Sequence, residues 1–166
     1  MVNVNIALFI GRFQPFHRGH YRVVKDLKQK YTPVIGIGSS EKMNSFENPL
    51  SFNERRKMVR SCFPGTDVFA IPDRGDDELW VEEIVERIRF KVVVTGNDWT
   101  KRCFRKKGYG TERPRMYNRD KYEGTTIREL AAERNEDWKD LVPECSRNLL
   151  ENFNFEERME ELKGKD

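Results

Sequence analysis

Histidine and cysteine, the residues that most often hold transition metals, are scarce in this sequence. Its 166 residues include only two histidines, His17 and His20, and both lie in one short segment. The three cysteines, Cys62, Cys103 and Cys145, are far apart and include no C-x-x-C pair. This spacing excludes a zinc ribbon and a disulfide framework, and it predicts reduced thiols. We therefore expect no metal site built from protein ligands.

Long apolar runs are also missing. No stretch reaches the roughly 20 apolar residues of a membrane helix, and the first residues lack the basic start of a signal peptide. We expect no contact with a membrane and a cytoplasmic location. The length predicts one domain, residues 1–166, with a helical C-terminal part from about residue 125 to 166.

The sequence does contain a regular alternation of short apolar runs and amphipathic segments. The apolar runs predict parallel strands at residues 4–10, 33–38, 68–71 and 91–95. Helical spacing predicts helices at residues 19–30, 51–62, 78–89, 143–153 and 155–163. Capping-box patterns begin at Ser51 and at Thr126, and the second predicts a further helix that starts at residues 124–126. A short strand is expected near residues 114–117.

This order of elements is typical of an α/β fold, a doubly wound, Rossmann-like parallel sheet with C-terminal helices. Ligands of such sheets bind beyond the carboxyl ends of the strands. We therefore expect four segments to face one crevice: residues 11–20, 36–40, 96–99 and 124–128.

The segment at residues 11–20 carries the strongest chemical signal and reads GRFQPFHRGH. It joins the first predicted strand to a helix, and a helix N-terminus favours anions because its N–H groups are unpaired. His17 and His20 can donate hydrogen bonds to phosphate oxygens there, and Arg12 adds a cation. Gly19 removes a side chain that would block close approach. The segment therefore predicts a phosphate site.

A basic segment supports an alternative from a different class of protein. Residues 101–121 hold nine basic and two acidic residues, a net charge of +7. The aromatic residues among and beside them are Trp99, Phe104, Tyr109 and Tyr117. Interleaved basic and aromatic residues occur in nucleic-acid-binding modules. That reading leaves residues 11–20 unexplained, so we expect no nucleic-acid partner.

Two segments resemble the signatures of the nucleotidylyltransferase superfamily. Residues 11–20 resemble its G-x-F-x-P-x-H-x-G-H motif. Residues 123–128, EGTTIR, resemble its S-S-T-x-x-R motif: Thr125 and Arg128 match, whereas Glu123 and Gly124 replace two serines. Over nearly the whole chain, the sequence resembles the archaeal-type nicotinamide-nucleotide adenylyltransferases, with supporting stretches at residues 36–40, 48–59, 78–84, 95–99 and 117–129.

The resemblance implies transfer of the adenylyl group of ATP to nicotinamide mononucleotide (NMN), which gives NAD and pyrophosphate. It implies Mg²⁺ bound mainly through the ATP phosphates and a homo-oligomer, often a hexamer. The catalytic residues it implies are His17, His20, Arg12 and Arg128. The ATP-binding residues are Gly11, Phe13, Gly19, Gly96, Asn97, Thr125 and Ile127, and the NMN-binding residues are Ser39, Asp73 and Trp80.

Some positions leave the acceptor open. Glu47 stands where the resemblance implies an arginine, and Asp77 where it implies an asparagine. Trp80 lies in the first turn of a predicted helix, where an aromatic residue is more often part of the core. A sister enzyme that uses flavin mononucleotide or phosphopantetheine is therefore the nearest alternative, and a non-catalytic nucleotide sensor is another.

Overall fold

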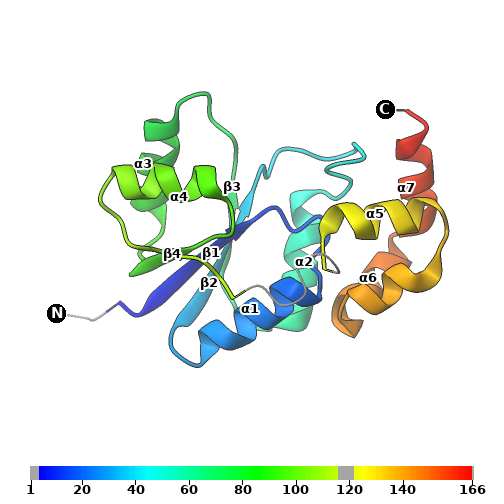
Figure 1. Cartoon of the computed structure of the whole chain (residues 1–166), viewed down its shortest axis with the longest axis horizontal. Helices are drawn as coiled ribbons and strands as arrows, with labels where there is room; N and C mark the ends of the chain where they lie inside the picture. Colours follow the sequence, from blue (N-terminus) through cyan, green and yellow to red (C-terminus); the bar gives the residue numbers. More distant parts are fainter. Residues whose placement is uncertain (1–3, 116–121, 166) are drawn as a thin grey trace.

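Five parallel strands form the centre of the fold (Figure 1). The structure is a computed structural model, which describes residues 4–115 and 122–165. Its strands are β1 (Ile6–Gly11), β2 (Thr32–Gly38), β3 (Val68–Ile71), β4 (Val92–Val94) and β5 (Thr111–Glu112). They lie in the order β3-β2-β1-β4-β5, with every neighbouring pair parallel. This order reverses between β1 and β4, as in a doubly wound sheet, so the predicted fold class is confirmed.

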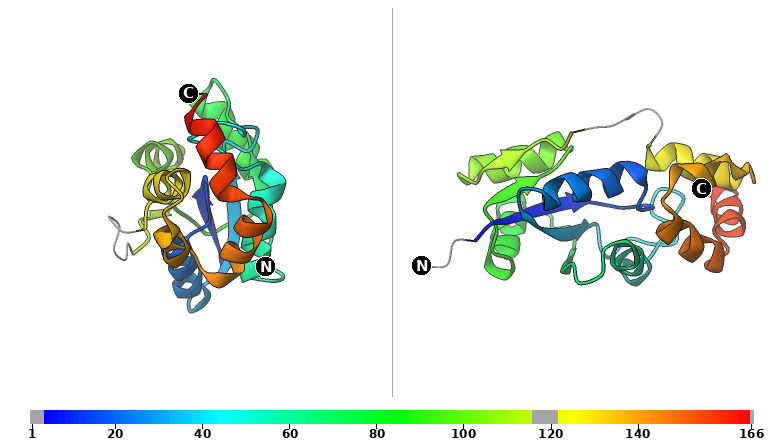
Figure 2. Two further views of the ribbon diagram at one scale, coloured as in Figure 1. Left: turned by 90° about the vertical axis from the view of Figure 1, so that its right-hand side faces the viewer. Right: turned by 90° about the horizontal axis from the view of Figure 1, so that it is seen from below.

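Helices cover both faces of the sheet (Figures 1 and 2). The helices α1 (Arg18–Lys28) and α2 (Phe52–Cys62) pack on one face, and α3 (Asp77–Arg87) and α4 (Asp98–Lys106) pack on the other. Along β1, Ala7 and Phe9 join the core with α1 and α2, whereas Leu8 and Ile10 join the core with α3 and α4. Successive strand residues point to opposite faces, so burial on both sides explains the continuous apolar runs.

A layer of helices lies beyond one end of the sheet (Figure 2). It consists of α5 (Gly124–Ala132), the 3₁₀ helix η1 (Glu136–Leu141), α6 (Glu144–Asn152) and α7 (Phe155–Lys163). Buried residues of this layer, among them Ile127, Leu150 and Phe155, belong to the same core as α1 and α2. The layer is therefore packed against the sheet domain through a continuous apolar interior.

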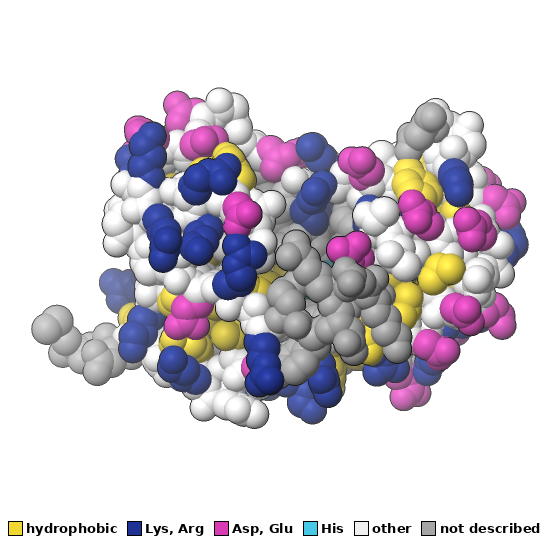
Figure 3. All heavy atoms as spheres, viewed as in Figure 1, with side chains coloured by type: hydrophobic (Ala, Val, Ile, Leu, Met, Phe, Trp, Pro, Cys, Tyr) yellow, Lys and Arg dark blue, Asp and Glu magenta, His cyan; other side chains and the backbone are white. Residues whose placement is uncertain are grey.

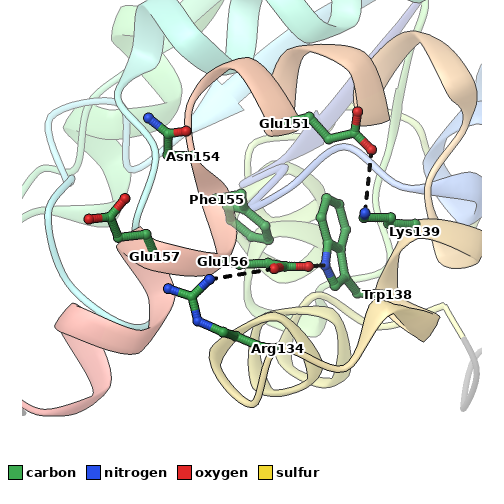
Figure 4. A pocket seen from close by; sticks show the side chains of 8 residues that line it. All are labelled: Arg134, Trp138, Lys139, Glu151, Asn154, Phe155, Glu156 and Glu157. Atoms are coloured by element: carbon green, nitrogen blue, oxygen red, sulfur yellow. Dashed lines mark hydrogen bonds and ion pairs between the residues drawn. The ribbon is translucent and has the colours of Figure 1, made fainter.

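Charged side chains surround a small cavity of about 190 Å³ within the helical layer (Figure 4). Trp138 Nε1 donates a hydrogen bond to Glu156 Oε1 over 2.9 Å, and Arg134 pairs with Glu156 over 3.8 Å. Lys139 lies 3.7 Å from Glu151. These contacts join η1 and the end of α5 to α6 and α7, so we assign this cavity a structural role.

Three of the predicted local features have different outcomes. The capping box of α2 is confirmed: Glu54 N donates to Ser51 Oγ over 3.2 Å, and Ser51 N donates to Glu54 Oε1 over 3.0 Å. The helix predicted to start at residues 124–126 is confirmed, because α5 begins at Gly124, but the capping box at Thr126 is wrong: the N-cap residue is Glu123, and it makes no side-chain capping bond. A short strand was predicted near residues 114–117; the structure has its short strand earlier, as β5 at Thr111–Glu112, and position 117 lies outside the described residues.

The prediction of reduced thiols is wrong for two of the three cysteines. Cys62, at the end of α2, forms a disulfide with Cys145 in the first turn of α6, with their Cα atoms 5.3 Å apart. Cys103 is free and buried. The bonded pair is separated by 83 positions in the chain, so spacing gave no sign of it. Thiol content therefore no longer supports the cytoplasmic location, which stays a prediction.

Among residues 4–115 and 122–165, no helix is both long and apolar enough to cross a membrane.

Candidate active site

Two cavities meet at the histidine pair. The larger, of about 380 Å³, lies at the carboxyl ends of β1 and β4, where Gly11, Gly96 and Asn97 line it. The smaller, of about 290 Å³, is lined by Arg12, Arg128 and Glu47. Both are lined by His17, His20, Gly124 and Thr125. Three of the four segments predicted to share a crevice therefore do so, whereas residues 36–40 line neither cavity.

The two histidines are held by backbone hydrogen bonds at the start of α1. His17 is the N-cap, and its Nδ1 accepts from Gly19 N over 3.0 Å and from His20 N over 3.4 Å. His20 Nδ1 accepts from His17 N over 3.1 Å. The two rings lie almost parallel, with centroids 3.6 Å apart. Because each Nδ1 is an acceptor, the proton of each neutral ring is on Nε2.

Burial keeps both rings neutral. It lowers the pKa of His17 to about 3. It also lowers the pKa of His20 well below its usual value, and the charge of a protonated His17 would lower it further. Each ring therefore presents one fixed Nε2–H donor at neutral pH, and its other nitrogen is already used by the backbone. Such a pair stabilises developing negative charge without itself exchanging a proton.

Gly19 is required by the close packing of this segment. A Cβ atom at Gly19 would lie 2.9 Å from His17 Cε1 and 3.1 Å from His17 Nδ1. Any side chain at Gly19 would therefore displace the ring that caps α1. This contact gives a physical reason for glycine between the two histidines.

Arg128 connects α5 to the loop after β1. Its Nη1 donates to Gln14 O over 2.7 Å and its Nη2 to Thr125 Oγ1 over 3.2 Å. The side chain is buried and its Nε has no hydrogen-bond partner. Burial and the nearby Arg12 lower the pKa of Arg128. Its guanidinium thus combines a structural contact with a positive charge on the wall of the smaller cavity.

Gly124 is explained by the position of Arg128. A Cβ atom at Gly124 would lie 2.7 Å from Arg128 Nη1 and 3.1 Å from Gln14 O. A serine at this position, as in the S-S-T-x-x-R motif, would require the arginine to move. The replacement by glycine therefore matches this particular arginine conformation.

Two residues predicted to bind ATP are almost completely buried, although Phe13 also lines the smaller cavity. Phe13 is 1% exposed, and its ring packs edge-on against His20 with centroids 4.7 Å apart. Ile127 is fully buried in the core. Phe13 therefore supports the His20 ring, and Ile127 can meet a ligand only through its backbone.

The residues predicted to bind NMN lie outside the two cavities. Ser39 Oγ donates to both carboxylate oxygens of Asp73, over 3.0 and 3.1 Å, and Lys42 pairs with Asp73 over 3.3 Å. Trp80 is only 5% exposed and packs against Trp99 with ring centroids 4.8 Å apart. The structure brings Ser39 and Asp73 together but places Trp80 in the core between α3 and α4.

Within its described part, residues 101–115, the basic segment is an exposed surface without an aromatic platform. Lysine and arginine side chains gather over α4 (Figure 3), where Arg102, Arg105 and Lys106 are exposed. Phe104 is fully buried, and Trp99 is 40% exposed. Tyr117 lies outside the described residues. Stacking of successive bases needs several exposed rings, so this surface does not favour the nucleic-acid alternative.

A protein-held metal centre was not expected, and the described ranges contain no group of three or more His, Cys, Asp or Glu that could form one. Side-chain oxygens that line these cavities include the Glu123 carboxylate in the larger one, the Glu47 carboxylate in the smaller one and the Thr125 hydroxyl in both. Such a donor set suits an ion that reaches the site already bound to phosphate oxygens.

Sequence reasoning missed two residues that organise the site. The Gln14 side chain exchanges hydrogen bonds with the backbone of Leu50, over 3.0 and 2.9 Å. Arg55 is fully buried and binds several carbonyl oxygens of the loops after β1 and β2. The polar residue types gave no signal of this burial, although the helical spacing that buries Met58 and Val59 also places Arg55 on the inner face of α2.

Comparison with known proteins assigns the fold and site to a class. The profile of the cytidylyltransferase-like family matches residues 8–130. A nicotinamide-nucleotide adenylyltransferase of Methanococcus aeolicus is 38% identical over 96% of this chain and 96% of its own length. That of Archaeoglobus fulgidus is 37% identical over 96% of this chain and 98% of its own. The chain belongs to the cytidylyltransferase-like family, and within it to the same family as these adenylyltransferases.

Solved structures share the fold. A bifunctional NMN adenylyltransferase/ADP-ribose pyrophosphatase from Francisella tularensis, complexed with AMP and a manganese ion, has a TM-score of 0.72 at 21% identity. The match covers 96% of this chain and 52% of that protein, so this chain spans about half its length. A Thermotoga maritima protein bound with α-thio-ATP has a TM-score of 0.60 at 13% identity, over 90% of this chain and 55% of its own.

Proposed function

We propose that this chain transfers the adenylyl group of ATP to NMN, forming NAD and releasing pyrophosphate. The observation that carries the proposal is the histidine pair, with its two fixed Nε2–H donors, at the junction of two cavities. The names of the relatives from Methanococcus and Archaeoglobus support NMN as the acceptor.

The two cavities suit different parts of the substrates. The larger one combines apolar walls, including Phe9, Ile10 and Val23, with the polar side chain of Asn97, a combination suited to a nucleoside. The smaller one presents Arg12 and Arg128, which suit phosphate groups. We propose that the adenosine part of ATP occupies the first, and that its phosphates pass the histidine pair toward the second.

The reaction we propose is a direct displacement at the α-phosphorus of ATP. A phosphate oxygen of NMN forms a bond to that phosphorus, and the bond to the β-phosphate oxygen breaks, so that pyrophosphate leaves. A phosphate monoester has its second pKa near 6, so the nucleophile is already anionic and needs no general base. His17 and His20 donate hydrogen bonds to the charged oxygens, and Arg12 and Arg128 orient the phosphates.

We propose that Mg²⁺ enters as part of the ATP substrate. It would be held mainly by phosphate oxygens and water, with Glu123, Thr125 and Glu47 among the protein oxygens available to it. The ion neutralises part of the phosphate charge when bound. Assays with Mg²⁺ and Mn²⁺ in turn, after removal of metal by a chelator, test which ion the enzyme prefers.

For the acceptor, we propose contacts with Ser39 and Asp73, which the structure already joins by hydrogen bonds. A contact with the ring of Trp80 would require Trp99 to shift, because Trp80 is only 5% exposed. Stacking on Trp80 is therefore the weaker part of this assignment.

Pyrophosphate release from ATP, measured with a panel of acceptors, tests the proposed function. NMN is expected to support turnover, and flavin mononucleotide and phosphopantetheine are not. Turnover with one of those two alone would make the chain a sister enzyme with a different acceptor. ATP binding without turnover of any acceptor would make it a nucleotide sensor.

We also propose a homo-oligomer, with a hexamer as the expected size. Basic side chains gather over α4, whereas acidic ones are abundant over the C-terminal helices at the other end of the molecule (Figure 3). Complementary charges at opposite ends favour head-to-tail contacts, which close into rings. Light scattering in low and high salt tests this proposal, because a contact of this kind weakens as salt increases.

A further inference from the structure

Arg55 is a charged residue buried completely inside α2. Its guanidinium group, which has five N–H donors, lies within hydrogen-bonding distance of six backbone carbonyl oxygens. Nε binds Ser51 O at 3.2 Å, Nη1 binds Arg12 O at 3.0 Å and Gly38 O at 3.1 Å, and Nη2 binds Ser39 O, Ser40 O and Lys42 O at 3.3 Å each. Burial lowers its pKa to about 10, so the charge persists at neutral pH. Carbonyl dipoles thus offset the cost of burying this cation.

Two of these carbonyls belong to the residues just before Phe13 and Ser39, which have unusual backbone conformations. Phe13 has φ +53° and Ser39 has φ +46°, the left-handed region that non-glycine residues adopt at a cost of roughly 1–2 kcal/mol. The φ angle of a residue orients the carbonyl of the residue before it. Arg55 Nη1 binds the carbonyls of Arg12 and Gly38, which directly precede Phe13 and Ser39. Arg55 Nη1 therefore binds the peptide group that precedes each of the two left-handed residues, Phe13 and Ser39.

The two turns carry different parts of the proposed site. Phe13 packs edge-on against His20, with ring centroids 4.7 Å apart. Ser39 Oγ donates to the Asp73 carboxylate. Arg55 touches neither cavity at the histidines, but it binds the backbone of both loops.

We propose that Arg55 is a positioning residue that sets the placement of the loop after β1 relative to the loop after β2. Through the loop after β1 it fixes the position of the phosphate-binding residues, and through the loop after β2 it fixes the position of the acceptor-binding residues. The two substrates are thereby aligned for reaction. The identity of the second side rests on the proposed function. Misplacement by about 1 Å can cost about 100-fold in rate, so alignment of this kind has a measurable effect.

Arg55→Lys tests the proposal because it keeps the charge and removes the fork. A lysine ammonium has three donors on one atom and cannot span the six carbonyls. We expect kcat to fall at least about tenfold and the KM for NMN to rise, while the Kd for ATP in the absence of NMN changes less than about threefold. A uniform change in all three would point to general loosening and would overturn the proposal.

Met58→Ala is the matched control. Met58 is fully buried in the same helix and belongs to the apolar core. Its truncation lowers stability by roughly 2–5 kcal/mol without removing a polar contact to either loop. Measured equally far below each variant's Tm, Met58→Ala is expected to keep kcat within about twofold of wild type. Equal losses of kcat in the two variants would refute a positioning role.

Hydrogen exchange gives a readout that needs no turnover. In Arg55→Lys, peptides that cover residues 12–14 and 38–42 are expected to exchange faster together, and Met58→Ala is expected to leave them unchanged. Faster exchange of one segment alone, or of neither, would overturn the proposal. Failure of wild type to use any acceptor refutes the proposed function instead, because this exchange result does not depend on an acceptor.

A second variant covers the case in which lysine disturbs folding. Arg55→Ala leaves space for a free guanidinium ion, so guanidinium chloride at about 10–50 mM, far below denaturing concentrations, is expected to restore part of kcat. Ammonium at the same concentration lacks the fork and is expected to restore none. Recovery of Tm by guanidinium without recovery of kcat would show a purely structural role.

Discussion

Replacing both Cys62 and Cys145 with serine is expected to lower the free energy of unfolding by about 2–4 kcal/mol. The disulfide closes a chain segment of 83 positions between α2 and α6. Loop-closure entropy for a segment of that length gives an upper value of about 4.5 kcal/mol at 25 °C. The measured loss is expected to be smaller, because the unfolded chain keeps residual structure. In a protein of this size, it corresponds to a fall in Tm of roughly 5–15 °C.

Urea unfolding of the oxidised wild type, the reduced wild type and the double variant measures this effect. Reduction and double substitution are expected to give similar losses, because both open the same loop. Cys103→Ser is the control for an unbonded cysteine, since Cys103 is free and buried. Its unfolding is expected to remain sensitive to reductant, whereas that of the double variant is not.

A thiol titration tests whether the disulfide between Cys62 and Cys145 forms. The unfolded, unreduced protein is expected to show one reactive thiol per chain, and the reduced protein three. Three thiols without reductant would mean that the bond does not form. An oxidised protein with the bond but no loss of stability on reduction would refute the loop-entropy argument instead.

Four further results are expected. His20→Ala should lower kcat by about 10²–10³, as for loss of one donor to a developing charge, and turnover within a few-fold of wild type would exclude that role. His17→Asn should keep the helix cap through its side-chain oxygen, so Tm should change little while kcat falls by about the same factor as in His20→Ala. His17→Ala should also lose the cap, which lowers the free energy of unfolding by about 0.5–2 kcal/mol. The free energy of unfolding, measured against pH, should decrease as the pH falls from 6.5 toward 3, because His17 binds a proton in that range when unfolded but not when folded, where its pKa is about 3. The slope from this residue is at most about 1.4 kcal/mol per pH unit. A flat profile would contradict the burial of His17 as a neutral ring. Glu47→Gln should tighten ATP or NMN binding by about two- to tenfold in calorimetry, because it removes a negative charge beside Arg12 and Arg128, and weaker binding of both would show that the carboxylate contacts a ligand.

Local signals in the sequence predicted the sheet and most helices. The strand of residues 68–71 and the capping box of Ser51 and Glu54 are found where expected, because both depend on residues close together in the chain. The crevice at the strand ends was also predictable, since parallel strands bring their carboxyl ends to one edge. The clustering of His17 and His20 with Arg128 was predicted only through matching motifs, since 108 positions separate His20 from Arg128.

The errors concern contacts between distant parts of the chain. Cys62 and Cys145 meet because the C-terminal helices fold back onto α2, which spacing alone does not reveal. The T-x-x-E pattern at Thr126 forms no capping box because α5 already begins at Gly124, with Glu123 as its N-cap, so Thr126 lies inside the first turn. Arg55 is a similar case: its residue type suggests solvent, yet six carbonyls from three segments surround it.

The meeting of two cavities at one pair of rings has a consequence for inhibitor design. A single molecule that joins an adenosine group to a polyanionic group could occupy both, and the link would make the second binding event intramolecular. Both cavities are lined by His17, His20, Gly124 and Thr125, so a linker between the two groups would pass these residues.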